Sequence, residues 1–298
     1  MKIVNWCIII FLVVSMWGCS DASKQPSQQG QTKTESAYIE NKGSDTIVNL
    51  ALAWAERYSE VRPDVRISVT GGGSGTGLAA LTNGTVDIAN ASRAIKAEEI
   101  AMLEEQGYTP VEFVIARDAI AVIVNSNNPI QKLTLGEVSK IYLGEINNWK
   151  ELGGEDRPIV RLSRETNSGT HVYFLEQVIR LGNKEDTNIF SADTLLLPSS
   201  EGIIVEVRDN PNAIGYDGLG YVTPDVKVIA IAKNSQVAYI YPSVETVTDG
   251  TYPISRNLYM YTREEPSGEV KVYLDWILSS EAQDIVAELG FVPNVPAK

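Results

Sequence analysis

Residues Thr70 to Gly77 form a glycine-rich stretch, TGGGSGTG, between a predicted strand and a predicted helix. Glycine tolerates backbone conformations that other residues avoid, so this stretch predicts a tight turn. Its core, Ser74-Gly75-Thr76, has two counterparts at helix starts, Ser44-Asp45-Thr46 and Ser168-Gly169-Thr170. Ser and Thr cap helices, and the free N–H groups and dipole of a helix N-terminus attract anions. If the fold brings the three triplets together, they will surround one small anion.

The charge balance restricts what the chain can bind. Its 298 residues carry 25 basic and 38 acidic side chains, a formal net charge of −13. So acidic a surface excludes nucleic acid as a partner and excludes broad electrostatic adhesion to anionic lipid. An anion must therefore be held by local dipoles and a few well-placed arginines.

The N-terminal segment predicts export. Residues 1–18 are mostly apolar after Lys2, which indicates a signal peptide. Gly18 stands directly before Cys19 at the end of this run, as in bacterial lipoproteins, in which such a cysteine becomes the lipidated, palmitate-carrying N-terminus. The alternatives are an uncleaved anchor or a secretory signal cut elsewhere. The polar, Gln- and Ser-rich residues 19–36 predict a disordered tether between lipid and folded body.

Short apolar runs alternate with amphipathic ones from residue 37 onward, which predicts an α/β protein. We expect two lobes, the first at 37–116 plus 257–298 and the second at 117–256. Arg117 and Asp118 separate two adjacent predicted strands, an arrangement that suits a chain crossing between lobes. The predicted strands are 38–41, 65–70, 86–91, 111–116, 119–124, 158–162, 213–216, 227–232 and 257–262; the predicted helices are 45–61, 76–82, 97–106, 134–143, 171–181, 200–208, 268–278 and 280–289.

Common enzyme motifs fail on this sequence. The glycine-rich turn lacks the final glycine of a nucleophile elbow, because Thr76 stands there, and no Gly-Lys-Ser/Thr follows as in a nucleotide P-loop. The single histidine, His171, leaves a Ser-His-acid hydrolase open, although a surface or packing role is the simpler interpretation. No metal site and no cofactor are predicted.

Two arginines follow predicted strands directly, where a parallel α/β sheet binds ligands. They are Arg93, after Ser92, and Arg164, after Ser163. The planar guanidinium suits oxyanions because it donates two parallel hydrogen bonds. Arg256 also follows a serine, but we interpret it as a surface ion pair, like Arg62.

Five motifs together resemble the phosphate-binding protein of the bacterial high-affinity phosphate ABC transporter. Their order and spacing match along nearly the whole chain after the tether. The resemblance implies a two-lobed periplasmic-binding-protein fold that closes on phosphate and is no enzyme. It also implies an extracytoplasmic protein that serves an ABC permease. The motifs are GSDT at 43–46, TGGGSGTG at 70–77, NGTVDIANASR at 83–93, SRETNSGT at 163–170 and AIGY at 213–216.

Carried over residue by residue, the resemblance implies a ligand set from both lobes. In one branch of the family an aspartate stands where Arg93 stands here, and it accepts the proton of hydrogen phosphate. We expect Asp45 to replace that acceptor and Arg93 to offset its charge. A binding protein for sulfate, molybdate or tungstate would show the same donors and remains the alternative. The predicted set is Ser44, Asp45, Thr46, Ser74, Arg93, Arg164, Ser168, Gly169 and Thr170.

Overall fold

A computed structural model describes residues 37–294 of the chain. The predicted signal peptide, the tether and the lipidation residue Cys19 lie outside the described residues. The strands are β1 (Ala37–Gly43), β2 (Val65–Thr70), β3 (Ile88–Ala91), β4 (Val111–Asn125), β5 (Lys132–Thr134), β6 (Val160–Arg164), β7 (Leu195–Leu197), β8 (Ala213–Gly218), β9 (Val226–Val228), β10 (Ala230–Ala232), β11 (Ser255–Thr262) and β12 (Val292–Pro293). The α-helices are α1 (Asp45–Val61), α2 (Ser74–Thr82), α3 (Ala97–Glu104), α4 (Leu135–Leu143), α5 (Gly169–Phe174), α6 (Ser200–Asp209), α7 (Val244–Thr248), α8 (Gly268–Ile277) and α9 (Ser280–Glu288). Short 3-10 turns lie at Trp149–Leu152 and Leu219–Tyr221, and a π-helical turn at Leu175–Ile179 continues α5.

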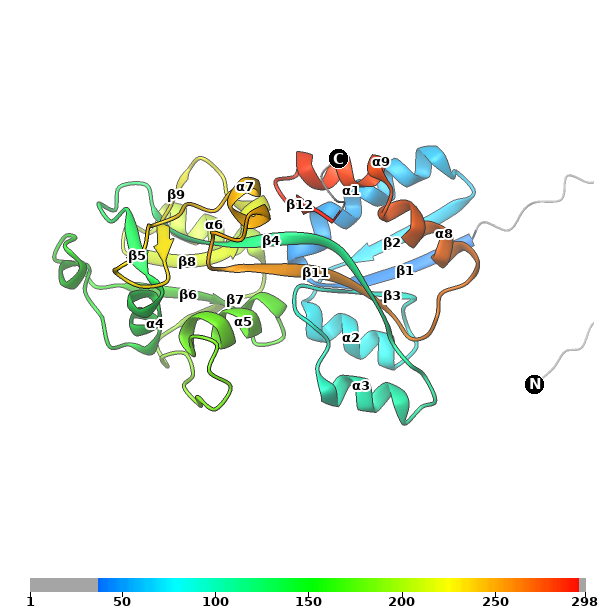
Figure 1. Ribbon diagram of the computed structural model, residues 1–298, viewed down its shortest axis with the longest axis horizontal. Coiled ribbons are helices and arrows are strands. Elements are labelled where there is room, and N and C mark those ends of the chain that lie inside the picture. Colours follow the sequence, from blue (N-terminus) through cyan, green and yellow to red (C-terminus); the bar gives the residue numbers. More distant parts are fainter. Residues whose placement is uncertain (1–36, 295–298) are drawn as a thin grey trace, which may run out of the picture. The chain divides into compact units, whose positions relative to one another are not determined.

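One mixed sheet runs through the described chain in the order β2-β1-β3-β11-β4-β8-β6-β7. The long strands β4 and β11 lie side by side and antiparallel, and they pass from one half of the molecule to the other (Figure 1). We call the elements β1 to α3 with α8 and α9 the first lobe, and the elements β5 to α7 the second lobe. Both lobes therefore share β4 and β11.

The structure corrects one expectation about the crossing. The two strands expected at 111–116 and 119–124 are a single strand, β4, that continues through Arg117 and Asp118. The charged residues interrupt the apolar pattern but not the backbone, because each finds a partner: Arg117 donates to the carbonyl oxygen of Val247, and Asp118 pairs with Arg256. A break in hydropathy is therefore not a break in the strand.

The first lobe has helices on both faces of its sheet. Helix α1 buries Ile47, Leu50 and Trp54, which recur at helical spacing, against Leu274 of α8 and Val286 of α9. Helix α2 covers the opposite face. The carboxyl ends of β1, β2 and β3 meet the starts of α1 and α2, which is where a parallel sheet presents a ligand site.

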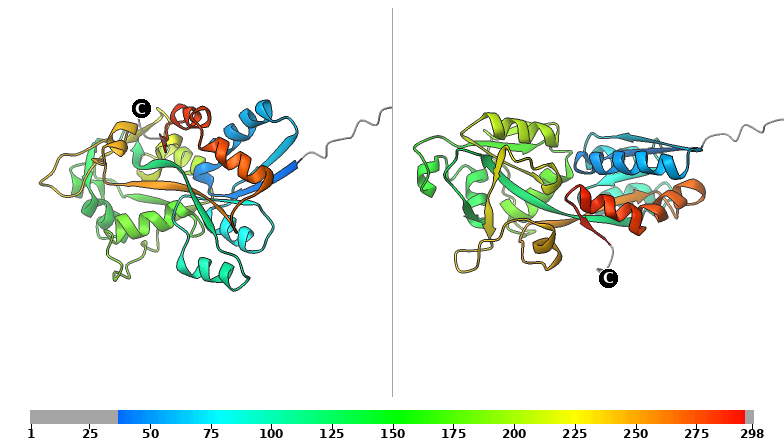
Figure 2. Two further views of the ribbon diagram at one scale, coloured as in Figure 1. Left: turned by 45° about the vertical axis from the view of Figure 1, so that its right-hand side comes forward. Right: turned by 90° about the horizontal axis from the view of Figure 1, so that it is seen from above.

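The second lobe repeats this layering, and Figure 2 shows both lobes from further sides. Alternate residues of β4 point to opposite faces of the sheet. Val122 belongs to the hydrophobic cluster that includes α4 and α5, and Ile123 belongs to the cluster that includes α6. Because helices cover both faces of the sheet here, this part of β4 consists of an unbroken run of apolar residues. The two lobes have separate hydrophobic clusters, while the lobe limits expected from the sequence stay a prediction.

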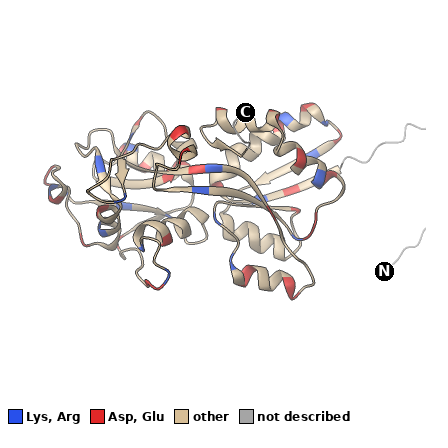
Figure 3. Ribbon diagram, in the orientation of Figure 1, with Lys and Arg blue, Asp and Glu red and all other residues tan. Residues whose placement is uncertain are grey.

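Basic (blue) and acidic (red) positions alternate along the ribbon in Figure 3. Within residues 37–294, no helix is both long and apolar enough to cross a membrane.

Candidate anion-binding site

The first Ser-x-Thr triplet begins α1. Ser44 is the N-cap residue, but its hydroxyl makes no capping hydrogen bond and is buried. The next residue, Asp45, accepts a hydrogen bond from the backbone N–H of Gly72 at 2.9 Å, which ties the start of α1 to the glycine-rich turn. The buried hydroxyl of Ser44 thus remains available at a helix start.

The glycine-rich turn lies directly against this helix start. Gly72 and Gly73 have φ values of 113° and 91°, a region that favours glycine. The N–H of Gly73 donates to the carbonyl oxygen of Gly43 at 2.9 Å. Helix α2 then begins at Ser74, two residues before the predicted start, and the Ser74 hydroxyl accepts from the N–H of Ser92 at 3.0 Å.

The third triplet reaches the first two from the second lobe. Ser168 caps α5 by accepting from the N–H of Thr170 at 3.2 Å. The Thr170 hydroxyl lies 2.9 Å from the hydroxyl of Thr46, and both are buried. A Cβ atom at Gly169 would lie 2.3 Å from the Ser74 hydroxyl oxygen, so only glycine permits this approach. The structure therefore brings all three predicted triplets together.

Arg164 connects the lobes at the same place. One of its Nη atoms donates to Asp45 at 2.6 Å, and the other donates to the hydroxyl of Ser200 at 2.8 Å and lies 3.6 Å from Asp217. Asp217 is fully buried, and this burial raises its pKa. The guanidinium is thus held in one orientation by groups from both lobes.

Arg256 is the clearest correction to the sequence analysis. From the sequence we expected Arg256 to form a surface ion pair. In the structure Arg256 is buried, and it pairs with the fully buried Asp118 at 2.9 Å. Its guanidinium also donates to the hydroxyls of Thr46 and Thr170, at 3.3 and 3.0 Å. Burial raises the pKa of Asp118 to about 6, although Arg256 opposes the shift. Arg256 therefore joins the first and third triplets.

Arg93 points elsewhere. Its guanidinium forms a two-pronged pair with Glu99, at 2.6 and 2.8 Å, and no contact with Asp45 is found among the described residues. Arg93 lines a neighbouring cavity of about 390 Å³, together with Lys96, Tyr173 and Arg256. The expected role of Arg93 beside Asp45 therefore has no support from this geometry.

Outside the buried cluster, Asn167 joins the two lobes through hydrogen bonds that we call the latch. The side-chain amide of Asn167 donates to the carbonyl oxygen of Gly72 at 2.9 Å and to the hydroxyl of Thr76 at 3.3 Å. The carbonyl oxygen of Asn167 accepts from the N–H of Gly75 at 3.0 Å. These bonds join the loop before α5 to the glycine-rich turn and close the cleft on that side.

His171 lies beside the site without the geometry of a catalytic base. Its Nδ1 is 2.9 Å from the carbonyl oxygen of Arg164 and 3.1 Å from the hydroxyl of Ser163, and burial lowers its pKa. Among residues 37–294 no carboxylate contacts its ring. The contacts indicate that His171 supports the backbone of Arg164.

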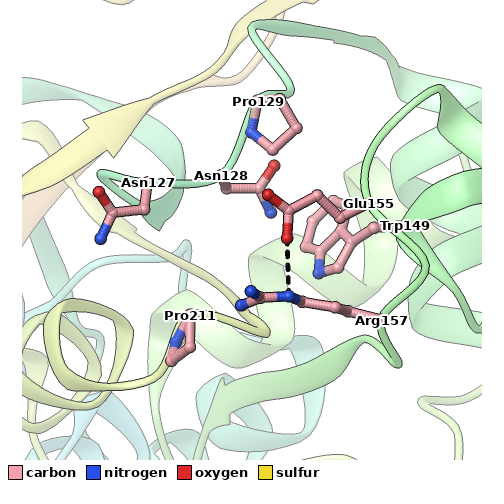
Figure 4. A pocket seen from close by; sticks show the side chains of 7 residues that line it. All are labelled: Asn127, Asn128, Pro129, Trp149, Glu155, Arg157 and Pro211. Carbon is pink, nitrogen blue, oxygen red and sulfur yellow. Dashed lines mark ion pairs between the residues drawn. The ribbon is translucent and has the colours of Figure 1, made fainter.

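The small pocket in Figure 4 contains none of these groups. It lies around Trp149 and is closed on one side by the ion pair of Glu155 with Arg157, at 2.7 Å. Its volume is about 50 Å³, and no residue of the three triplets lines it. The described residues also contain no group of His, Cys, Asp and Glu able to hold a metal ion.

The fold and the groups between the lobes define a class: a two-lobed solute-binding protein with buried hydroxyls, helix starts and paired arginines where its lobes meet. A family model described as a PBP superfamily domain matches residues 27–281. The chain is 33% identical over 280 residues to the phosphate-binding protein PstS of Pseudomonas aeruginosa, covering 88% of this chain and 84% of the relative. It is 34% identical over 282 residues to PstS of Bacillus subtilis, covering 94% and 88%. The chain therefore belongs to the PstS family of phosphate-binding proteins, within the PBP superfamily.

Solved structures agree with this assignment. A Clostridium perfringens protein described as a phosphate ABC transporter substrate-binding protein, solved with bound phosphate, is 35% identical with a TM-score of 0.77. The alignment covers 87% of this chain and all of that one, 100%. An ABC-type phosphate transport receptor from Vibrio cholerae is 27% identical with a TM-score of 0.68, covering 86% and 100%. The predicted two-lobed fold and the resemblance to this family are confirmed.

Proposed function

We propose that this protein captures inorganic phosphate in its interlobe cleft and delivers it to an ABC importer. The observation that carries the proposal is the meeting of three Ser-x-Thr helix starts around Arg164 and Arg256. The phosphate-binding relatives support it. Hydroxyls, backbone N–H groups and guanidiniums are hydrogen-bond donors, the partners that the oxygens of a desolvated phosphate require.

The proposed ligand set combines the sequence prediction with what the structure adds. Phosphate would contact donors of the three triplets and of Arg164, and Arg256 and Ser92 join them. We assign Arg93 to the adjoining cavity, at the edge of the site. The predicted contacts retained in the cleft are Ser44, Asp45, Thr46, Ser74, Arg164, Ser168, Gly169 and Thr170.

Titration calorimetry with phosphate, arsenate and sulfate tests the proposal. Tight, saturable binding of phosphate with weak binding of sulfate is the expected result. Tighter binding of sulfate or molybdate than of phosphate would make the chain a binding protein for another oxyanion.

Asp45→Asn should reduce the preference for phosphate over sulfate. A carboxylate can accept a hydrogen bond from the proton of hydrogen phosphate but repels fully ionised sulfate. An amide accepts the hydrogen bond less strongly and repels sulfate less. Loss of one hydrogen bond to a charged group corresponds to about 1.5–3 kcal/mol, or roughly a ten- to hundredfold change in the ratio of affinities. Competition calorimetry measures this ratio.

The matched control is Asp64→Asn, which changes an exposed carboxylate paired with Arg62 in the same lobe. Its selectivity should equal that of the wild type. An unchanged ratio in Asp45→Asn would show that another group accepts the phosphate proton.

Asn167→Ala should weaken the latch without altering the buried donors. Two side-chain hydrogen bonds to the first lobe are lost, and each contributes about 0.5–1.5 kcal/mol. We expect phosphate to dissociate several times faster while association is nearly unchanged, as measured by stopped-flow fluorescence. Asn183→Ala, at an exposed residue of the second lobe, is the control. A slower association at constant dissociation would contradict the latch.

The proposed role is binding and not catalysis, because His171 supports backbone and no acid faces it among the described residues. Sustained turnover of a phosphate ester by the wild type would refute this. We further propose that Cys19 carries lipid and holds the protein on the outer side of the cell membrane beside its permease subunits. Mass spectrometry of the mature N-terminus tests the anchor, and uptake of labelled phosphate by cells with and without the chain tests the delivery.

A further inference from the structure

Asp118 and Arg256 occupy an unusual position for parts of a ligand site. They are register partners on β4 and β11, the two strands that both lobes share. From there Arg256 donates to Thr46 and to the carbonyl oxygen of Ser92 in the first lobe, and to Thr170 in the second. The pair therefore touches both lobes through one guanidinium.

The charges of the cleft do not favour a dianion as they stand. Two guanidiniums, Arg164 and Arg256, face three carboxylates, Asp45, Asp118 and Asp217. With every group ionised the cluster is negative before any ligand enters. Burial of further negative charge without compensation is costly in a site excluded from water. Uptake of a proton by one carboxylate removes this conflict.

Asp118 is the carboxylate best placed for that proton. Asp45 is the most exposed of the three, with a side chain 16% exposed, and both of its oxygens accept strong hydrogen bonds, from Arg164 and Gly72. Asp217 lies behind Arg164 and accepts from the hydroxyl of Ser200 and the N–H of Gly218 at one oxygen only, so it is the rival site for the proton. Asp118 also accepts at both oxygens, from Arg256 and from the N–H of Leu219, but it alone shares Arg256 with Thr46 and Thr170, so negative charge there competes directly with a ligand for the guanidinium.

The surroundings of Asp118 agree with this assignment. Arg256 faces it from β11, Asp217 from β8, Tyr173 from α5 and Tyr252 from the loop before β11. Arg256 is the only cation among these described neighbours; the others are a carboxylate, the buried Tyr252 and the partly buried Tyr173. Burial raises the pKa of Asp118 to about 6, so little further stabilisation of the acid form is needed to protonate it near neutral pH.

We infer that Asp118 takes up one proton from solvent when dianionic phosphate binds, so that Arg256 is freed to carry the charge of the ligand. This deepens the proposed function and rests on it. The proton passes from solvent to a carboxylate oxygen of Asp118, and no other covalent bond forms or breaks. Asp118 is thereby a specificity-determining residue that acts through Arg256.

The linkage fixes the direction of the pH effect. Below the pKa of Asp118 in the free protein this carboxyl already holds its proton, so binding takes up none there. Above that pH the free protein has lost the proton while the complex keeps it, so affinity falls as pH rises, by up to about tenfold per unit until the complex also titrates. Phosphate itself also gains and loses a proton with pH, but the effect of this on the measured affinity is the same in all variants.

Calorimetry in two buffers of different ionisation enthalpy counts the protons taken up with inorganic phosphate. We compare the wild type with Asp118→Asn, which is uncharged at every pH, and with Asp217→Asn. The wild type should take up more protons than Asp118→Asn at mildly alkaline pH, and its affinity relative to Asp118→Asn should fall as pH rises. Asp217→Asn, the variant of the rival carboxylate, should retain part of the uptake, and the exposed control Asp64→Asn should retain all of it.

An infrared difference spectrum of the wild type, free against phosphate-bound, keeps the test valid if Asp118→Asn folds poorly. A new protonated-carboxyl band, shifted by carboxyl ¹³C labelling of aspartate, is the expected result. Equal proton uptake in wild type and Asp118→Asn, loss of the uptake in Asp217→Asn alone, or absence of the band would overturn the inference. Absence of any phosphate binding by the wild type would instead refute the proposed function.

Discussion

Arg164→Gln is expected to reduce phosphate affinity by roughly thirtyfold to several thousandfold. The substitution removes a buried guanidinium that donates to Asp45, Ser200 and the proposed ligand, and it leaves Asp45 without its cation. Truncation of one partner of a buried charge pair costs about 2–5 kcal/mol, which corresponds to this range. Titration calorimetry measures the affinity, and thermal unfolding of the free protein measures stability.

Two further variants separate recognition from folding. Arg208→Gln alters an exposed arginine of the same lobe, paired only with its neighbour Asp209 among the described residues, and should bind phosphate normally. The double variant Asp45→Asn/Arg164→Gln removes both charges and should regain stability without regaining affinity. If the double variant also regains affinity, Arg164 does not contact phosphate and acts only on the fold.

Gly169→Ala is expected to prevent full closure of the cleft. The added Cβ would lie 2.3 Å from the hydroxyl oxygen of Ser74 and 2.6 Å from that of Ser92, and both serines are fully buried. Overpacking of this kind costs about 1–3 kcal/mol, so affinity should fall about tenfold to a hundredfold, and further in Gly169→Val. Because the clash exists only between lobes, unfolding of the free protein should change little.

Small-angle scattering distinguishes this mechanism from a simple loss of contacts. The wild type should become more compact with phosphate, whereas Gly169→Ala should keep the dimensions of the free protein. Gly136→Ala is the control, since its Cβ would meet nothing within 4 Å in α4. Normal compaction of Gly169→Ala with phosphate would contradict the proposed clash.

The sequence sufficed for those parts of the site that depend on local chemistry. Ser44 and Ser168 were recognisable because each stands directly before a helix, although only Ser168 makes a capping hydrogen bond. Arg164 was recognisable because it lies at the end of a strand. Helix α1 and strand β2 have the predicted bounds, since their apolar periodicities are strong and Pro63 separates them. The capping box from Thr134 to Glu137 is likewise present at the start of α4.

Long-range pairing could not be predicted in the same way. Asp118 and Arg256 are 138 residues apart, and neither lies in a motif that points to the other: Asp118 follows Arg117, and Arg256 follows Ser255. Only the antiparallel register of β4 and β11 makes them partners, and a single sequence does not encode that register locally. The role of Arg93 stays a prediction: its expected position after a strand resembles that of Arg164, and in the structure its guanidinium pairs with Glu99, six residues further on.

The direction of β1 has a practical consequence for assay design. The strand enters at Ala37 and delivers Ser44 to the cleft at its far end, so its seven residues separate the two points by about 20 Å. A biotin or surface linkage placed N-terminal to Ala37 would act on the end of β1 remote from the lobe contacts. The chain is therefore suited to immobilisation through its N-terminus as a reagentless phosphate sensor, with an environment-sensitive dye at Asn167 to report closure.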